Sequence, residues 1–135
     1  MNSPDEQANA LFAAAQRDWR TFLILMRDPE SPLETTLFHA QQTMEKGLKS
    51  ALVHAGIVFP RTHDLLELSE IATAHGLSLP VARDLLVRLG PYAVEFRYLG
   101  VIAPDVGLEE ARDAILILMD SLSAETITNR GMQTE

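Results

Sequence analysis

The stretch FHAQQTMEKGLKSALVHAGIVFPRTHDLLEL, Phe38 to Leu68, decides the fold of this chain. Its first half has a helical period, and an apolar stripe runs along it through Leu37, Met44, Leu48 and Leu52. Five polar side chains stand beside that stripe: Gln41, Gln42, Glu45, Lys46 and Lys49. An exposed i,i+4 pair of opposite charges adds only about 0.3 kcal/mol to a helix, which is too little to explain the cluster.

We expect this polar cluster to lie partly buried at a seam between helices, where it also fixes the helix register. Gln42 and Glu45 would satisfy amides of a loop or of a helix end. The stems of Lys46 and Lys49 would lie along apolar neighbours while their ammonium groups stay near water. Burial of this kind predicts a structural role for the cluster.

Proline, glycine and capping residues divide the chain into five predicted helices. These cover about Gln7 to Arg27, Pro32 to His54, Leu65 to Ala74, Leu79 to Gly90 and Leu108 to Ile127, and residues Pro91 to Tyr98 add a helical turn. Ser31 and Glu34 have the spacing of a capping box. Thr62 or Asp64 is the predicted cap of the third helix, and Ser78 that of the fourth.

The fold class predicted from this pattern is all-α, because no segment shows sustained period-two alternation. With 135 residues the chain is long enough for one core and too short for two ordinary domains. We expect a single domain over residues 1–135, with about 1–6 and 128–135 frayed. The last helix is apolar almost all round between Ala114 and Met119, which predicts a central position or contact with a second subunit. In the first helix we expect the same two alternatives, core packing or contact with a second subunit, for Trp19 and for the FLILM run, Phe22 to Met26.

Composition limits the classes of function. The formal net charge is −8, which argues against a general binder of nucleic-acid backbones. Residues 46–97 nevertheless hold six bases against five acids, so a local anion site remains compatible with the acidic total. There is no cysteine, no apolar run long enough to cross a bilayer, and no basic start typical of a secretory signal. We therefore expect a cytoplasmic protein.

The same stretch resembles the HEPN family, the higher eukaryotes and prokaryotes nucleotide-binding domain. The residues that carry the resemblance are Gln42, Glu45, Lys46 and Lys49, then Pro60 to Leu65, and later the pair Arg97-Tyr98, which Leu99-Gly100 follow where the family often has proline. The resemblance implies a five-helix domain built on an up-and-down four-helix bundle, commonly a homodimer. It also implies a role in nucleotide or nucleic-acid biology, often beside a small nucleotidyltransferase in a toxin–antitoxin pair.

Ribonucleases of the wider HEPN superfamily carry an arginine followed, after four to six residues, by a histidine. The histidine moves protons and the arginine stabilises charge on the phosphate. None of the four histidines here, at 39, 54, 63 and 75, follows an arginine at that distance. We therefore favour a non-catalytic module that dimerises and binds a partner and a nucleotide. The alternative is a degenerate HEPN ribonuclease whose composite site forms across a dimer.

A candidate anion or nucleotide site consists of Lys46, Lys49, Arg61, His63, Arg97 and Tyr98. The competing interpretation is that Glu45, Asp64 and Glu95 neutralise these cations within the fold. For His63-Asp64 we favour a structural role, with a helix cap and a buried imidazole hydrogen bond. No histidine pair has zincin spacing and no acidic segment forms a calcium loop, so we expect neither a metal site nor a bound cofactor.

Overall fold

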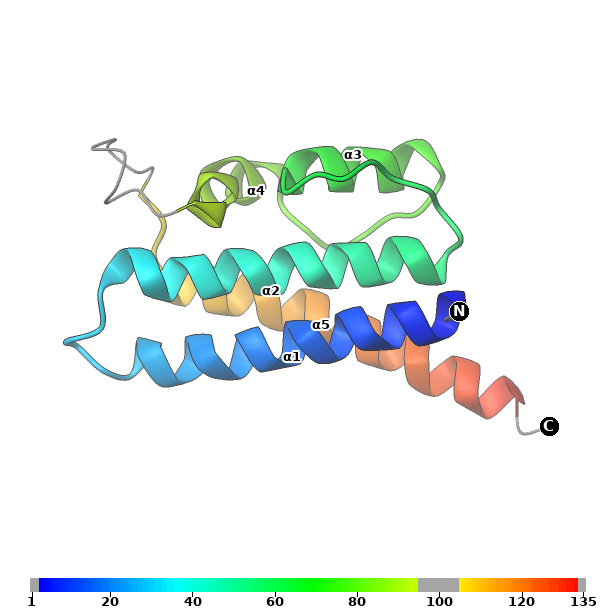
Figure 1. Ribbon diagram of the computed structural model, residues 1–135, viewed down its shortest axis with the longest axis horizontal. Coiled ribbons are helices and arrows are strands. Elements are labelled where there is room, and N and C mark those ends of the chain that lie inside the picture. Colours follow the sequence, from blue (N-terminus) through cyan, green and yellow to red (C-terminus); the bar gives the residue numbers. More distant parts are fainter. Residues whose placement is uncertain (1–2, 95–104, 134–135) are drawn as a thin grey trace.

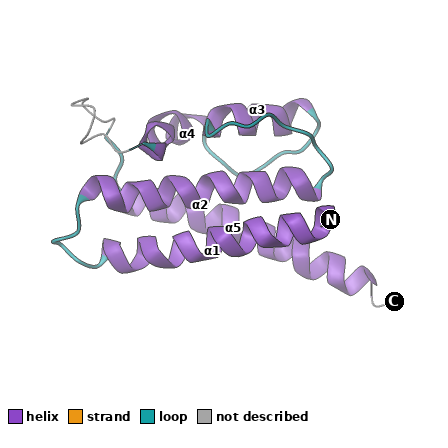
Figure 2. Ribbon diagram, in the orientation of Figure 1, coloured by secondary structure: helices purple, strands orange, loops and turns teal. Residues whose placement is uncertain are grey.

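The described part of the chain, residues 3–94 and 105–133 of a computed structural model, is helical (Figure 1). Its elements are α1 (Pro4–Met26), α2 (Leu33–His54), α3 (Leu65–Ala74), α4 (Arg83–Leu89), the 3-10 helix η1 (Gly90–Ala93) and α5 (Leu108–Gln133). The described residues contain no strand (Figure 2). The predicted all-α class with five helices is confirmed.

Helix α2 is the centre of the domain. It contacts α1, α3, α4, η1 and α5. Figure 1 shows α1 alongside one flank of α2, α3 and α4 end to end along the other, and α5 behind. Twelve of the 22 residues of α2 are buried, against three of 23 in α1. The short helices α3 and α4 together take the place of one long helix, which is how a four-helix bundle contains five helices.

Two Ser-Pro starts in the sequence behave differently. Before α1, Ser3 accepts a hydrogen bond from the Glu6 amide at 3.2 Å, so this helix begins three residues earlier than the predicted Gln7. Before α2, the predicted capping box at Ser31 is absent and Pro32 occupies the N-cap without a side-chain hydrogen bond. The Ser31 amide donates to the Asp28 carbonyl at 3.0 Å, in the tight turn that follows α1.

The prediction for the start of α3 is confirmed and that for α4 is wrong. Asp64 caps α3 by accepting hydrogen bonds from the amides of Leu66 and Glu67. Helix α4 begins only at Arg83 and not after Ser78. The intervening segment is irregular, with a bend at Pro80 and a hydrogen bond from the Val81 amide to the Leu79 carbonyl at 2.8 Å. Its apolar residues pack against the core: Leu77, Leu79 and Val81.

Helix α5 crosses α2 closely at Gly47. A Cβ atom added to Gly47 would lie 3.2 Å from Leu118 Cδ2 and 3.6 Å from Leu122 Cδ1. Helix α5 buries Ile115 and Leu118 there. Leu116 and Ile117 lie on its outer face and are 45% and 56% exposed. The central position considered for the last helix therefore belongs to α2, and α5 keeps an apolar outer face.

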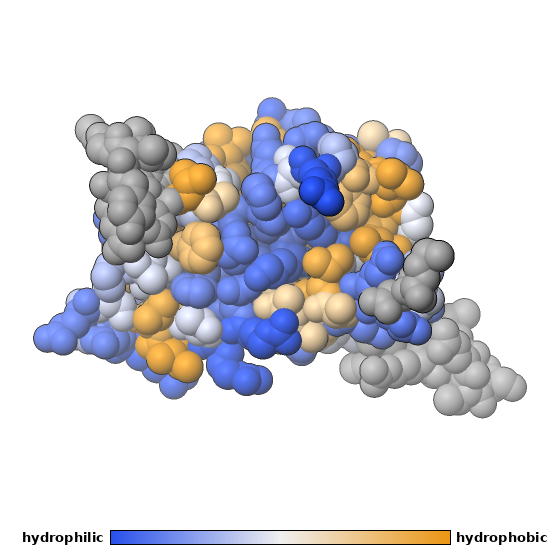
Figure 3. Space-filling view, viewed as in Figure 1, coloured by the Kyte–Doolittle hydropathy of each residue, from blue (hydrophilic) through white to orange (hydrophobic). Residues whose placement is uncertain are grey.

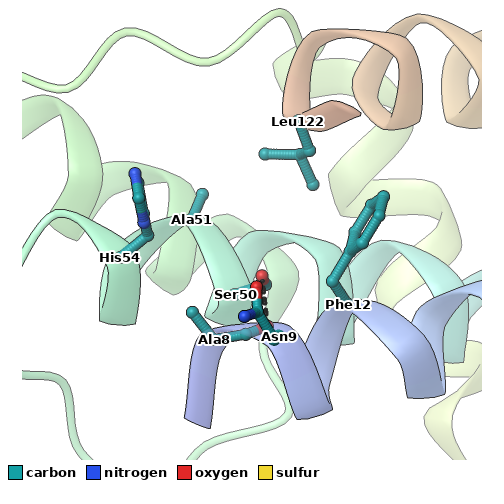
Figure 4. A pocket seen from close by; sticks show the side chains of 7 residues that line it. All are labelled: Ala8, Asn9, Phe12, Ser50, Ala51, His54 and Leu122. Atoms are coloured by element: carbon teal, nitrogen blue, oxygen red, sulfur yellow. Dashed lines mark hydrogen bonds between the residues drawn. The ribbon is translucent and has the colours of Figure 1, made fainter. Parts of the chain in front are cut away.

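The hydroxyl of Ser50 ties α1 to α2 near a small cavity (Figure 4). Ser50 Oγ donates to the Ala8 carbonyl at 2.8 Å. The cavity beside this bond has a volume of about 20 Å³ and is also lined by Phe12 and Leu122. That is room for one water molecule, so the junction of α1, α2 and α5 is closely packed.

Candidate functional site

The carboxylate of Glu45 organises the polar cluster in the middle of α2. Glu45 is only 4% exposed. It accepts hydrogen bonds from Gln41 Nε2 at 3.1 Å, from His63 Nδ1 at 3.0 Å and from Lys49 Nζ at 3.1 Å. Because His63 belongs to the connection after α2, this carboxylate holds that connection against the middle of the helix that precedes it.

The amide of Gln41 completes this attachment. Gln41 is fully buried, and its Nε2 also donates to the backbone carbonyl of His63 at 3.2 Å. Gln42 Nε2 in turn donates to Gln41 Oε1 at 2.8 Å. The prediction that Gln42 would bond to a backbone amide of the loop is therefore wrong. Gln41 makes the bond to the loop, and it bonds to a carbonyl. Among the described side chains, no buried nitrogen or oxygen lacks a hydrogen-bond partner.

The imidazole of His63 is exposed, contrary to the expected buried hydrogen bond. Its side chain is 76% exposed, although Nδ1 reaches Glu45. An ionised carboxylate can only accept a hydrogen bond, so Nδ1 must carry the proton. This contact fixes the orientation of the ring and leaves the opposite nitrogen, Nε2, facing the solvent side.

Burial and hydrogen bonding act in opposite directions on the pKa of Glu45. Burial alone raises the pKa, because the charged form loses hydration. Hydrogen bonds from His63, Gln41 and Lys49, together with the charge of Lys49, outweigh that effect and hold the pKa below its ordinary value of 4.5. Glu45 is therefore an anion at neutral pH, with Lys49 as its counter-charge.

The two lysines of the cluster have separate partners. Lys46 Nζ donates to Asp18 Oδ2 at 2.5 Å, and His39 Nδ1 contacts Asp18 Oδ1 at 3.0 Å. Asp18 belongs to α1, so Lys46 links α1 to α2. Lys49 instead bonds to Glu45, the carboxylate that holds the connection to α3. Sequence reasoning missed Asp18, although it falls between the buried residues Ala15 and Phe22 of the α1 stripe. A carboxylate inside an apolar stripe was the available signal.

Of the six candidate site residues, the structure brings Lys49 and His63 together on Glu45. Lys46 lies with Asp18, and Arg61 is exposed on the connection. Arg97 and Tyr98 lie outside the described residues, as does Glu95. Glu45 neutralises Lys49 as the competing interpretation expected, whereas Asp64 serves as a helix cap. Anion binding by the candidate set stays a prediction.

An apolar groove that sequence reasoning did not find lies next to His63. Its volume is about 450 Å³, and it is formed by the start of α3, by α4 and by η1. Among the residues that line it are His63, Asp64, Leu66, Leu86, Val87 and Val94. These residues come from two segments, 63–66 and 86–94, that are separated by about 20 positions along the chain, so no local motif could have indicated the groove.

The end of this groove region is tied to α5 by Arg88. Its guanidinium donates to both carboxylate oxygens of Glu110, at 2.7 and 2.8 Å, and to the Asp105 carbonyl at 3.0 Å. Hydrogen bonds from Arg88 lower the pKa of Glu110. Helix α4 is therefore held to the first turn of α5 as well as to α2.

Two further features of the described residues bear on function. No three histidine, aspartate or glutamate side chains among them lie close enough together to hold a metal ion. None of the described helices combines the length and the apolar character needed to cross a membrane.

The architecture and the polar cluster together define a class: a helical domain in which the central helix holds the following Pro-Arg-Thr-His-Asp connection through a buried carboxylate. A family model described as HEPN domain matches residues 8–119. The chain belongs to the HEPN domain family. Comparisons with curated proteins and with solved structures each give no match.

Proposed function

We propose that this HEPN domain is a non-catalytic module that forms a homodimer and binds a partner protein and a nucleotide, with a small nucleotidyltransferase as the expected partner. The HEPN family is associated with nucleotide and RNA binding. The observation that carries the proposal is that four polar side chains of α2 form hydrogen bonds within the fold: Gln41, Glu45, Lys46 and Lys49. Groups engaged in this way stabilise the domain and are not available for chemistry.

The outer surface supports the binding part of the proposal. Ile24 on α1 is 62% exposed, and Leu116 and Ile117 are exposed on α5. Figure 3 shows apolar side chains over the C-terminal end of α1, on a face whose middle is mostly hydrophilic. Exposed apolar groups of this kind, at the end of α1 and on the outer face of α5, favour contact with another protein surface.

We expect the protein to be a dimer in light scattering through the outer face of α5. The double variant Leu116→Lys, Ile117→Lys places two charges on this face and should give monomers, because an unpaired charge in an apolar interface is costly. Val58→Lys is the matched control, since Val58 is 89% exposed on the connection after α2, and it should stay dimeric. A wild-type monomer at high concentration would contradict the dimer.

The second candidate function is a degenerate ribonuclease, and the orientation of His63 is the observation that favours it. A ring held by a carboxylate through Nδ1, with Nε2 accessible, is suited to proton transfer. Arg61, two residues earlier, is the nearest arginine in the sequence.

Incubation of the purified protein with labelled RNA separates the two functions. The non-catalytic module predicts no cleavage above a buffer control, because the Arg-x4–6-His motif is absent. Cleavage that is lost in His63→Ala and kept in His75→Ala would replace the first proposal by the second. His75 is a suitable control because it is also exposed, with Nδ1 bonded to the Ile71 carbonyl at 2.9 Å.

A further inference from the structure

The groove beside His63 has apolar walls that are open to water. Leu86 is buried in its wall, while Val87 and Val94 are 50% and 54% exposed. A volume of about 450 Å³ lies within the range of pockets that bind small molecules. Covering these side chains with the apolar body of a ligand would release water from them and so favour binding.

The polar edge of the groove consists of hydrogen-bond acceptors. Nδ1 of His63 carries the proton that bonds to Glu45, so Nε2 of the neutral ring presents a lone pair. Asp64 Oδ1 accepts from the amides of Leu66 and Glu67. Among the described residues, neither His63 Nε2 nor Asp64 Oδ2 has a hydrogen-bond partner. A ligand at this edge must therefore bring donors.

The charges around this edge disfavour an anion. The first-turn amides of α3 that would bind an anion already donate to the carboxylate of Asp64. The ammonium of Lys49 is paired with Glu45, so these two charges balance. Among the described residues that line the groove, Asp64 brings the one carboxylate and there is no lysine or arginine, because the exposed Arg61 of the same connection does not line it. The chain as a whole carries a formal charge of −8.

We propose that this groove binds a small cation with an apolar body, in which an amidinium, guanidinium or ammonium group donates to Asp64 and His63 while the body covers Val87 and Val94. The apolar walls supply contact area, and the acceptor edge with its negative charge selects for a positive donor. This proposal goes beyond the proposed function and does not depend on it, because it concerns only the edge at His63 and Asp64. It removes His63 from the candidate nucleotide site and leaves the proposed dimer and partner protein unaffected.

Three probes of the same shape test the proposal: benzamidinium, neutral benzamide and anionic benzoate. Each is titrated into the full chain, labelled with nitrogen-15, and the amide shifts around the groove are followed by NMR. Benzamidinium should move the amides of Val87 and Ala93 and bind about tenfold more tightly than benzoate, since the edge attracts one charge and repels the other. Equal affinities, or shifts confined to other parts of the molecule, would overturn the proposal.

Two sets of variants separate the charge of the edge from the fold. Asp64→Asn keeps a side chain that can cap α3 and should weaken benzamidinium binding about two- to fivefold. Val87→Lys and Val87→Glu remove the same apolar contact but add opposite charges. The lysine variant should bind benzamidinium more weakly than the glutamate variant. Matching helical circular dichroism establishes that all three variants are folded, and equal binding by both Val87 variants would refute the electrostatic selection.

Discussion

Replacing Glu45 by methionine is expected to lower the free energy of unfolding by about 2–3 kcal/mol. Methionine keeps the volume of the side chain, so the loss reports the carboxylate itself. Without the carboxylate, the buried Gln41 amide loses one acceptor, and the ammonium of Lys49, whose side chain is 17% exposed, loses its counter-charge. Denaturation in urea measures the change as a shift of the midpoint at unchanged slope.

The pH dependence gives an independent check on the same residue. The pKa of Glu45 in the folded protein lies below 4.5, so the unfolded chain binds its proton more readily than the folded one. The stabilising contribution of Glu45 is therefore complete above about pH 4.5 and is lost as the pH falls through the lower, folded-state pKa. The difference in the free energy of unfolding between wild type and Glu45→Met should become smaller in that acidic range. A difference below about 0.5 kcal/mol at neutral pH would mean that the carboxylate does not fasten the connection.

Gly47→Leu is expected to destabilise the protein by about 3 kcal/mol, at the upper end of overpacking effects. The Cβ atom alone would stand 3.2 Å from Leu118 Cδ2, and the remaining leucine carbons would have to displace α5 from α2. Thermal or urea denaturation measures the loss.

Gly47→Ala is the matched control for this prediction. It adds the Cβ only, and the gain of about 1 kcal/mol in helix propensity offsets the close contact with a flexible leucine end. The alanine variant should therefore lie within about 1 kcal/mol of wild type. If Gly47→Leu were equally well tolerated, α5 would not cross α2 as closely as described.

Local signals in the sequence were sufficient for most helices of this domain. The end of α2 and both bounds of α3 follow from an apolar period that runs up to a cap or a glycine, all within a few residues. Gly56 and Gly76 follow these two helices with positive φ, of 73° and 80°, a conformation that glycine adopts without steric cost. The start of α4 was missed because a Ser-Leu-Pro signal was outweighed by the packing of Leu79 and Val81 on the core.

The candidate site was predictable only in part, because its geometry depends on contacts between distant residues. The sequence indicated that Glu45 and Lys49 would pair, since they are one helical turn apart. It did not indicate that Lys46 would pair with Asp18, 28 positions away in the chain, and so lie apart from Lys49 and His63. It also did not indicate that His63 would contact Glu45 while keeping its ring exposed, because that requires the path of the connection.

The position of α2 has a consequence for how the domain comes apart. Each of the other helices packs against α2. Unfolding any one of them therefore leaves α2 in place, whereas unfolding α2 removes the packing surface of all the others at once. Partial unfolding should therefore begin in the helices around α2. The backbone amide hydrogens of α2 should exchange with solvent only when the whole molecule unfolds.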